Sequence, residues 1–276
     1  MVKIVTDSTA SIPPELCTLL DITVVPIPIQ FGAETFLDGV EPVRSYYERL
    51  GAVAEPPSTS TPSPGTFVDV YQRLAGETVI SIHVMGTKSV LVNVARLAAS
   101  MLPDRRIHVV DSETTTLGLG LLVIAAARAA LQGQPAEAIV AWLDRQVPRV
   151  AVFAAIPQLT QLRRSGRISL GKAVLAGVLS IKPILYLGQG VADVVDKARG
   201  WETAVERMVQ LAWEKAGGAR VALAVVHTDA EAAAKALLAQ IQSRFHCMET
   251  MVAEAGPTLA AHAGPGALGV VTLPLD

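Results

Sequence analysis

The strongest constraint on the fold is the alternation of short, β-branched apolar runs with helical patterns through the first half of the chain. The runs that we predict as strands cover residues 2–6, 22–29, 78–84 and 106–110. Helical periodicity lies at residues 66–74, 89–101, 117–131 and 136–146. Strands that alternate with helices of this length are typical of βαβ units. The first half therefore predicts an α/β domain with a mainly parallel sheet.

The second half predicts a different sheet. Two strand-like runs, residues 180–187 and 191–197, flank Gly188-Gln189-Gly190, which indicates a β-hairpin. An apolar helix reaching residue 178 is predicted before the hairpin, and strands at 220–226, 247–253 and 267–273 after it. Hairpin and crossover connections together predict a mixed sheet. We therefore expect two α/β domains, residues 1–155 and 156–276.

Hydrophobic residues make up 51% of the 276 residues, and the mean hydropathy is +0.42. Such a chain can bury enough apolar surface to fold. The longest apolar runs, residues 117–131 and 173–187, are interrupted by charged residues or proline and fall short of the ~18 that a membrane span needs. We expect no integral membrane segment. The apolar excess predicts a core, or a core with an internal apolar cavity.

Charge and cysteine content exclude other classes of function. The net charge is −2, without the basic excess of a nucleic-acid-binding protein. Cys17 and Cys247 are far apart and form neither a disulfide framework nor a zinc motif, so we expect no metal. Asp7 interrupts the N-terminal apolar run, which is unlike a signal peptide. A reduced, cytoplasmic setting is predicted.

Several predicted strands end in small hydroxyl-bearing segments, including Asp7-Ser8-Thr9 and Met85-Gly86-Thr87-Lys88-Ser89. Such residues cap helices, and they also suit an anion site at the carboxyl edge of a sheet. The second segment lacks the first glycine of a P-loop. The motifs Gly-x-Ser-x-Gly and His-Glu-x-x-His are absent. Hydroxyl groups suited to an anion, together with the absence of these catalytic motifs, favour binding over catalysis, and we predict no catalytic residue.

The chain resembles the DegV family. Six segments in family order carry the resemblance: Ile4-Val5-Thr6-Asp7-Ser8-Thr9, Thr59-Ser60-Thr61-Pro62-Ser63-Pro64-Gly65, Asp111-Ser112 with Leu117-Gly118-Leu119-Gly120, Leu162-Arg163-Arg164-Ser165-Gly166-Arg167-Ile168-Ser169, Lys182-Pro183-Ile184, and His262-Ala263-Gly264-Pro265-Gly266-Ala267-Leu268-Gly269. The resemblance implies two α/β domains and a buried tunnel at their junction. It implies binding of a long-chain fatty acid, such as palmitate or stearate. It also implies that the carboxylate is presented to a fatty acid kinase, with no cofactor.

The resemblance also implies ligand-binding residues, namely Thr59, Ser60, Ser89, Arg167, Arg199, His262 and Gly264. One motif departs from the family, which typically reads Ser-Ile-His-x-Ser-Ser-x-Leu-Ser-Gly-Thr-Tyr. Counting from Ser81 places Ser89 at the carboxylate-binding serine, and Val90-Leu91-Val92 replaces Gly-Thr-Tyr. Aligning the motif on Gly86-Thr87 instead would place Met85 at the position of the carboxylate-binding serine.

Two other functions stay open from the sequence. One is a small-molecule transferase or hydrolase that uses the same strand ends, with His262 as its base. The other is a regulatory or interaction module.

Overall fold

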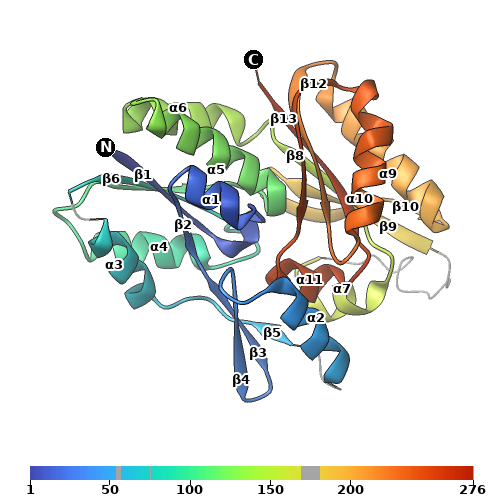
Figure 1. Ribbon diagram of the computed structural model, residues 1–276, viewed down its shortest axis with the longest axis horizontal. Coiled ribbons are helices and arrows are strands. Elements are labelled where there is room, and N and C mark those ends of the chain that lie inside the picture. The colour runs from blue at the N-terminus through green and yellow to red at the C-terminus, as the bar shows by residue number, and fades with distance from the viewer. Residues whose placement is uncertain (54–56, 75, 169–180, 276) are drawn as a thin grey trace.

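The computed structural model describes residues 1–53, 57–74, 76–168 and 181–275. Its first half, coloured blue to green in Figure 1, contains a four-stranded sheet in the order β2-β1-β6-β7. The strands are β1 Val2–Asp7, β2 Ile22–Val25, β6 Thr78–His83 and β7 Ile107–Asp111. Every pairing among them is parallel, which confirms the predicted parallel sheet.

Helices cover both faces of this sheet. One pair packs on one face, α3 Pro64–Arg73 with α4 Leu91–Ser100, and the other face carries α5 Thr116–Leu131 and α6 Ala136–Gln146. The short helix α1 Pro14–Leu19 leads into β2. The apolar residues of these helices and strands form one large buried cluster.

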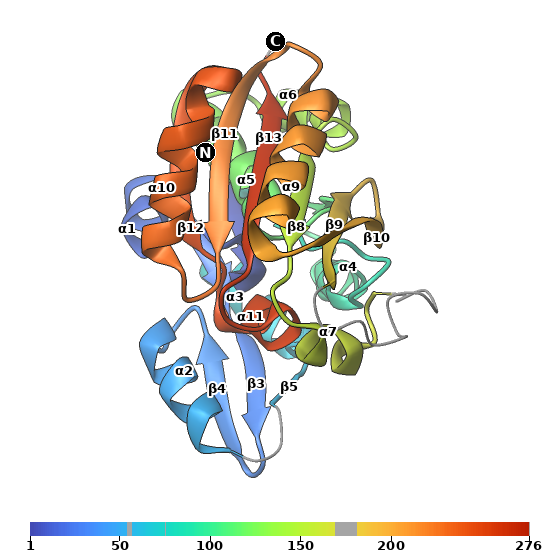
Figure 2. The same cartoon turned by 90° about the vertical axis from the view of Figure 1, so that its right-hand side faces the viewer.

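The second sheet has six strands in the order β10-β9-β8-β13-β11-β12. They are β8 Ala151–Ala155, β9 Ile181–Gly188, β10 Val191–Arg199, β11 Arg220–His227, β12 His246–Glu254 and β13 Leu268–Pro274. Among the described strands of this second sheet, only the β11–β12 pairing is parallel, so the predicted mixed sheet is confirmed. Gln189 and Gly190 turn the predicted hairpin with positive φ angles of 54° and 71°. Helices α9 Trp201–Ala216 and α10 Glu231–Ile241 lie on the outer face (Figure 2).

Helix α5 lies between the two sheets and contacts both β1 and β13. Two glycines make this close packing feasible. A Cβ at Gly118 would lie 2.6 Å from Val152 of β8, and a Cβ at Gly120 would collide with the carbonyl oxygen of Ala10. Since both sheets contribute to one buried cluster around α5, they share a core.

Strand pairing bears on where the two halves meet. The expected division at residue 155 groups β8 with the first half, whereas β8 pairs with β9 and β13 of the mixed sheet. We therefore propose that the boundary lies before β8, in the turn that follows α6.

A third, antiparallel sheet was not predicted. It contains β3 Ile27–Phe31, β4 Glu34–Asp38 and β5 Ser58–Thr59, in the order β4-β3-β5. The prediction of one strand over residues 22–29 was wrong, because the chain leaves the parallel sheet at Pro26, which has no amide hydrogen for a ladder. Helices α2 Val43–Ala52 and α11 Pro257–Ala263 pack on this sheet.

The predicted apolar helix that reaches residue 178 lies outside the described residues. Within the described ranges, no helix is both long enough and apolar enough to cross a membrane.

Candidate functional site

A cavity lies where the topology of the parallel sheet reverses direction. From β1 the chain first adds β2 on one side and later β6 on the other. The loops after β1 and β6 therefore separate, and such switch points are where open α/β sheets bind ligands. The cavity measures about 340 Å³, and its lining includes Thr9 after β1 and Met85 after β6. This volume is typical of a small-molecule site.

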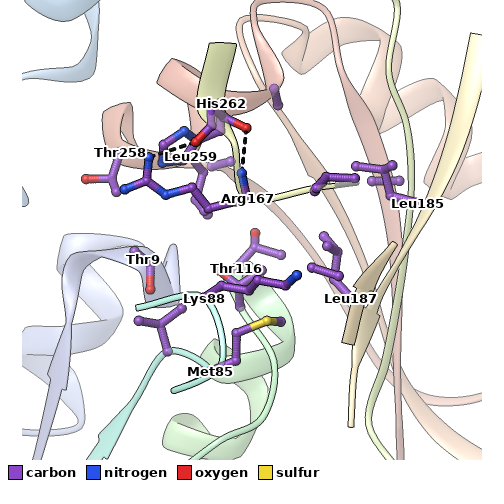
Figure 3. A pocket seen from close by; sticks show the side chains of 18 of the residues that line it. Thr9, Met85, Lys88, Thr116, Arg167, Leu185, Leu187, Thr258, Leu259 and His262 are labelled. Carbon is purple, nitrogen blue, oxygen red and sulfur yellow. Dashed lines mark hydrogen bonds between the residues drawn. The ribbon is translucent and has the colours of Figure 1, made fainter. Parts of the chain in front are cut away.

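The walls of the cavity are mainly apolar and come from the mixed sheet, from α11 and from the segments that follow β1 and β6. Val152 of β8 and Leu185 and Leu187 of β9 line it from the mixed sheet, and Leu259 lines it from α11. Figure 3 shows Leu185 and Leu187 on one side, away from Thr9, Thr258 and His262. The cavity therefore has an apolar end and an end with polar side chains.

Five of the seven predicted site residues line this one cavity, namely Thr59, Ser60, Ser89, Arg167 and His262. They come from β5, from the loop before α4, from the segment after helix α7 Leu159–Ser165, and from α11. Arg199 does not line the cavity; it ends β10 and is exposed. Gly264 follows α11, and its carbonyl oxygen accepts a hydrogen bond from Thr228 at 2.6 Å. The roles of all seven stay predictions.

The hydroxyl groups at the polar end differ in whether their hydrogen is free to donate to a ligand. Ser89 Oγ accepts from the backbone amide of Leu91 at 3.2 Å, which leaves its own hydrogen for a ligand. Ser60 Oγ donates instead to the carbonyl of Pro28 at 3.4 Å. The Thr59 hydroxyl makes no hydrogen bond with a described residue. Thr59 and Ser89 can therefore donate to an anion.

His262 is half-buried in the cavity wall. Burial, with a smaller contribution from the positive charge of Arg167, lowers the pKa of His262 to about 4. The imidazole is therefore neutral at pH 7. In the ligand-free protein His262 therefore offers a neutral N–H donor rather than a positive charge.

The loop that carries Ser89 is held on two sides. The amide of Gly86 donates to both carboxylate oxygens of Asp111 at 3.1 Å, and the hydroxyl of Thr87 donates to the carbonyl of Gly190 in the β9–β10 turn. A Cβ at Gly86 would lie 2.6 Å from Asp111 Oδ2, so a larger residue here would have to displace the Asp111 carboxylate. Met85 also lines the cavity, but its apolar side chain has no hydrogen to donate to a carboxylate.

Next to the cavity lies a buried polar network that sequence reasoning missed. Asp7 accepts hydrogen bonds from the amide and hydroxyl of Thr9 and, through Oδ2, from His83 Nδ1 at 3.0 Å. A carboxylate only accepts, so Nδ1 of His83 donates, and His83 Nε2 shares a hydrogen bond with the Ser81 hydroxyl, 2.7 Å away. Ser81 in turn accepts from Tyr71 at 2.9 Å. Asp7, Ser81 and His83 are fully buried, so this network fixes the strand ends rather than meeting a ligand.

The donor set suits an anion and not a metal ion. None of the described residues that line the cavity is acidic. Within the described part of the chain, no three His, Cys, Asp or Glu side chains gather as a metal site. The arrangement can bind an apolar chain that ends in an acidic group.

Comparisons with known proteins identify the family of the chain. The model of the DegV family of uncharacterised proteins matches residues 1–275. A DegV domain-containing protein of Deinococcus radiodurans is 38% identical over 282 residues, covering 100% of this chain and 99% of its own. The chain belongs to the DegV family. The structure has the DegV fold, an α/β architecture with one parallel and one mixed sheet.

Two solved DegV structures describe what those relatives bind. A DegV family protein from Thermus thermophilus, described as binding fatty acid, has a TM-score of 0.90 and 32% identity, with 99% of each chain covered. DegV from Bacillus subtilis, described as a fatty acid binding protein, has a TM-score of 0.89 and 30% identity, also over 99% of each chain.

Proposed function

We propose that this DegV family protein binds a long-chain fatty acid, such as palmitate or stearate, in a tunnel between its two sheets. The observation that carries the proposal is the cavity of about 340 Å³, with apolar walls from the mixed sheet and from the segments after β1 and β6, and hydroxyl donors at one end. Fatty acid binding by the Thermus thermophilus and Bacillus subtilis relatives supports it. The carboxylate lies at the polar end, and the acyl chain extends toward Leu185 and Leu187.

The energetics favour tight capture. Each buried methylene contributes ~0.8 kcal/mol, so an acyl chain of palmitate length gains roughly 10 kcal/mol. Association costs several kcal/mol of this gain. The carboxylate loses its water on entry and needs hydrogen-bond donors in exchange. Thr59, Ser89 and His262 supply these donors.

We further propose that the protein presents the carboxylate to a fatty acid kinase and performs no catalysis itself. The polar end of the cavity is bordered by Arg167, whose side chain is exposed. Arg199, also exposed, lies outside the lining and suits a role toward a partner or a transferred phosphoryl group.

The alternative of a transferase or hydrolase has weaker support. A general base usually needs a partner that orients it. His262 has no acidic neighbour among the described lining residues. The Ser81–His83–Asp7 network has the order of a catalytic triad, but its serine is fully buried.

Mass spectrometry of an organic extract of the purified protein tests the proposal. We expect a stoichiometric C14–C18 acid, or uptake of added palmitate. Ala154→Phe narrows the cavity from β8 and should reduce the bound acid, whereas Ala138→Phe, on the exposed side of α6, should leave it unchanged. Protein that stays empty after incubation with palmitate and oleate would contradict fatty acid binding.

A further inference from the structure

We propose that Lys88 supplies the positive charge that pairs with the acidic head group, so that the site selects anionic over neutral lipids. The inference rests on the proposed lipid-binding function and adds a residue that the family pattern does not provide. The resemblance gave leucine as the typical residue at this position, directly before the carboxylate-binding serine.

The first observation is the place of Lys88 in the cavity. Its side chain is half-buried and lines the cavity beside Ser89. Figure 3 shows it across the cavity from Arg167 and His262, extended toward Leu187. In the ligand-free protein the ammonium group therefore points along the cavity toward its apolar end, and the flexible side chain has to turn toward Ser89 to meet a carboxylate.

The second observation is that Lys88 has no charged partner among the residues that the structure describes. No described Asp or Glu forms an ion pair with Lys88. Other basic residues, such as Lys3, Arg207 and Lys235, do have acidic partners. No acidic residue lines the cavity in the described ranges. A half-buried ammonium without a counter-charge is unfavourable. An incoming carboxylate supplies that counter-charge, whereas an alcohol or ester does not.

The third observation is that the backbone of Lys88 is fixed before a ligand arrives. Its amide donates to the carbonyl of Met85 at 3.3 Å, closing a turn. Asp111 holds Gly86 and the β9–β10 turn holds Thr87, the two residues that directly precede Lys88. Binding therefore needs to order only the side chain of Lys88, which lowers the cost of forming the pair.

The other cationic candidates contribute less at this place. His262 is neutral at pH 7, as described above. The Arg167 guanidinium is exposed and donates to the carbonyl of Ser165 at 2.9 Å. Arg199 does not line the cavity. Lys88 is thus the cation best placed to meet a carboxylate inside the described lining.

The test compares palmitate with hexadecanol, which has the same chain length and no charge. Lys88→Met should weaken palmitate binding about tenfold or more, because a charge-assisted hydrogen bond is lost. It should leave hexadecanol binding unchanged or tighter. Lys88→Arg should retain the preference for palmitate. Lys197→Met, at an exposed lysine of β10 outside the lining, is the matched control and should change neither ligand.

Salt dependence gives a second measurement. Raising the ionic strength should weaken palmitate binding to the wild type more than to Lys88→Met. Equal losses for both ligands in Lys88→Met, or unchanged palmitate binding by a folded Lys88→Met, would overturn the role of Lys88. Failure of the wild type to bind either lipid would instead overturn the proposed function, and the role of Lys88 with it.

Discussion

The carboxylate of Asp38 on β4 accepts a hydrogen bond from the backbone amide of Thr258 at 3.0 Å, across 220 positions of the chain. Thr258 lies in the first turn of α11, where amide groups have no partner within the helix. Asp38 is only 2% exposed, and a Cβ at Gly256 would lie 2.8 Å from its Oδ1. Because α11 carries His262, Asp38 positions one wall of the cavity from the small antiparallel sheet.

Asp38→Ala should lower the free energy of unfolding by about 1–3 kcal/mol, because the buried amide of Thr258 loses its acceptor. Asp38→Asn should cost less. The amide oxygen of asparagine still accepts the hydrogen bond. The neutral side chain also avoids the cost of burying a charged carboxylate, the effect that raises the pKa of Asp38. Urea unfolding of both variants measures the difference. An Asn variant as unstable as the Ala variant would argue against this hydrogen bond as the cause.

His262 should make the free protein less stable in acid. Its pKa is about 4 in the folded protein and about 6.5 in an unfolded chain. Between these pH values the unfolded state binds more protons, so stability falls as the pH drops from about 6.5 to about 4. Unfolding free energies at pH 7 and pH 4.5 should differ less for His262→Gln than for the wild type. An identical pH dependence would refute the assignment.

Fatty acid binding should raise the pKa of His262, because a carboxylate beside the imidazole favours its charged form. NMR titration of the His262 ring, with and without palmitate, measures the change. Hexadecanol is the control and should leave the pKa near its value of about 4 in the free protein. A pKa that palmitate does not alter would place the carboxylate away from α11.

Ser89→Ala should weaken palmitate binding by about 1–2 kcal/mol, since one hydrogen-bond donor to the carboxylate is lost while the acyl chain stays buried. Thr59→Val should behave similarly. Ser60→Ala is the matched control from the same cavity, because the Ser60 hydroxyl donates to Pro28, and palmitate binding should change little. Equal losses in all three variants would contradict this division of donors.

Arg199→Ala should leave the content of bound lipid unchanged, because Arg199 lies outside the lining of the cavity. It should abolish acyl phosphate formation when a fatty acid kinase and ATP are supplied. Bound acid and acyl phosphate are measured on the same protein sample. Normal turnover, or an empty cavity, would show that Arg199 does not serve the partner.

Gly120→Ala should destabilise the protein by roughly 1–3 kcal/mol, because the new methyl group overlaps the carbonyl oxygen of Ala10. Gly51→Ala in α2 is the control. Nothing lies within 4 Å of a Cβ there, and alanine favours a helix, so stability should hold or rise by up to about 1 kcal/mol. Thermal unfolding compares the two, and similar effects would mean that close packing at Gly120 is unimportant.

The parallel and mixed sheets were predictable because the local sequence indicates their strands. Periodicity and the Gly188-Gln189-Gly190 turn indicated the parallel and mixed sheets. The antiparallel sheet was missed because Pro26 and Pro28 fall in one short apolar run, which then resembles a single interrupted strand. A local signal was present in Gly32-Ala33, a two-residue turn between β3 and β4.

The site was predictable only where motifs marked it. Thr59, Ser89, Arg167 and His262 lie in motifs, and the cavity brings them together. The Asp7–His83 bond joins residues 76 positions apart, and no local pattern shows such a pairing. Lys88 was passed over because the sequence gives no sign that its neighbours leave it without a counter-charge. The low pKa of His262 likewise depends on burial that only the fold supplies.

The position of α5 restricts how a lipid can enter. Because this helix packs against both sheets through Gly118 and Gly120, the sheets cannot swing apart as a hinged pair without exposing their shared core. We therefore expect a fatty acid to enter past the short elements around the polar end, such as α7, α11 and β5. Ligand exchange should then depend on the mobility of these elements, while α5 keeps its amide hydrogens protected from solvent.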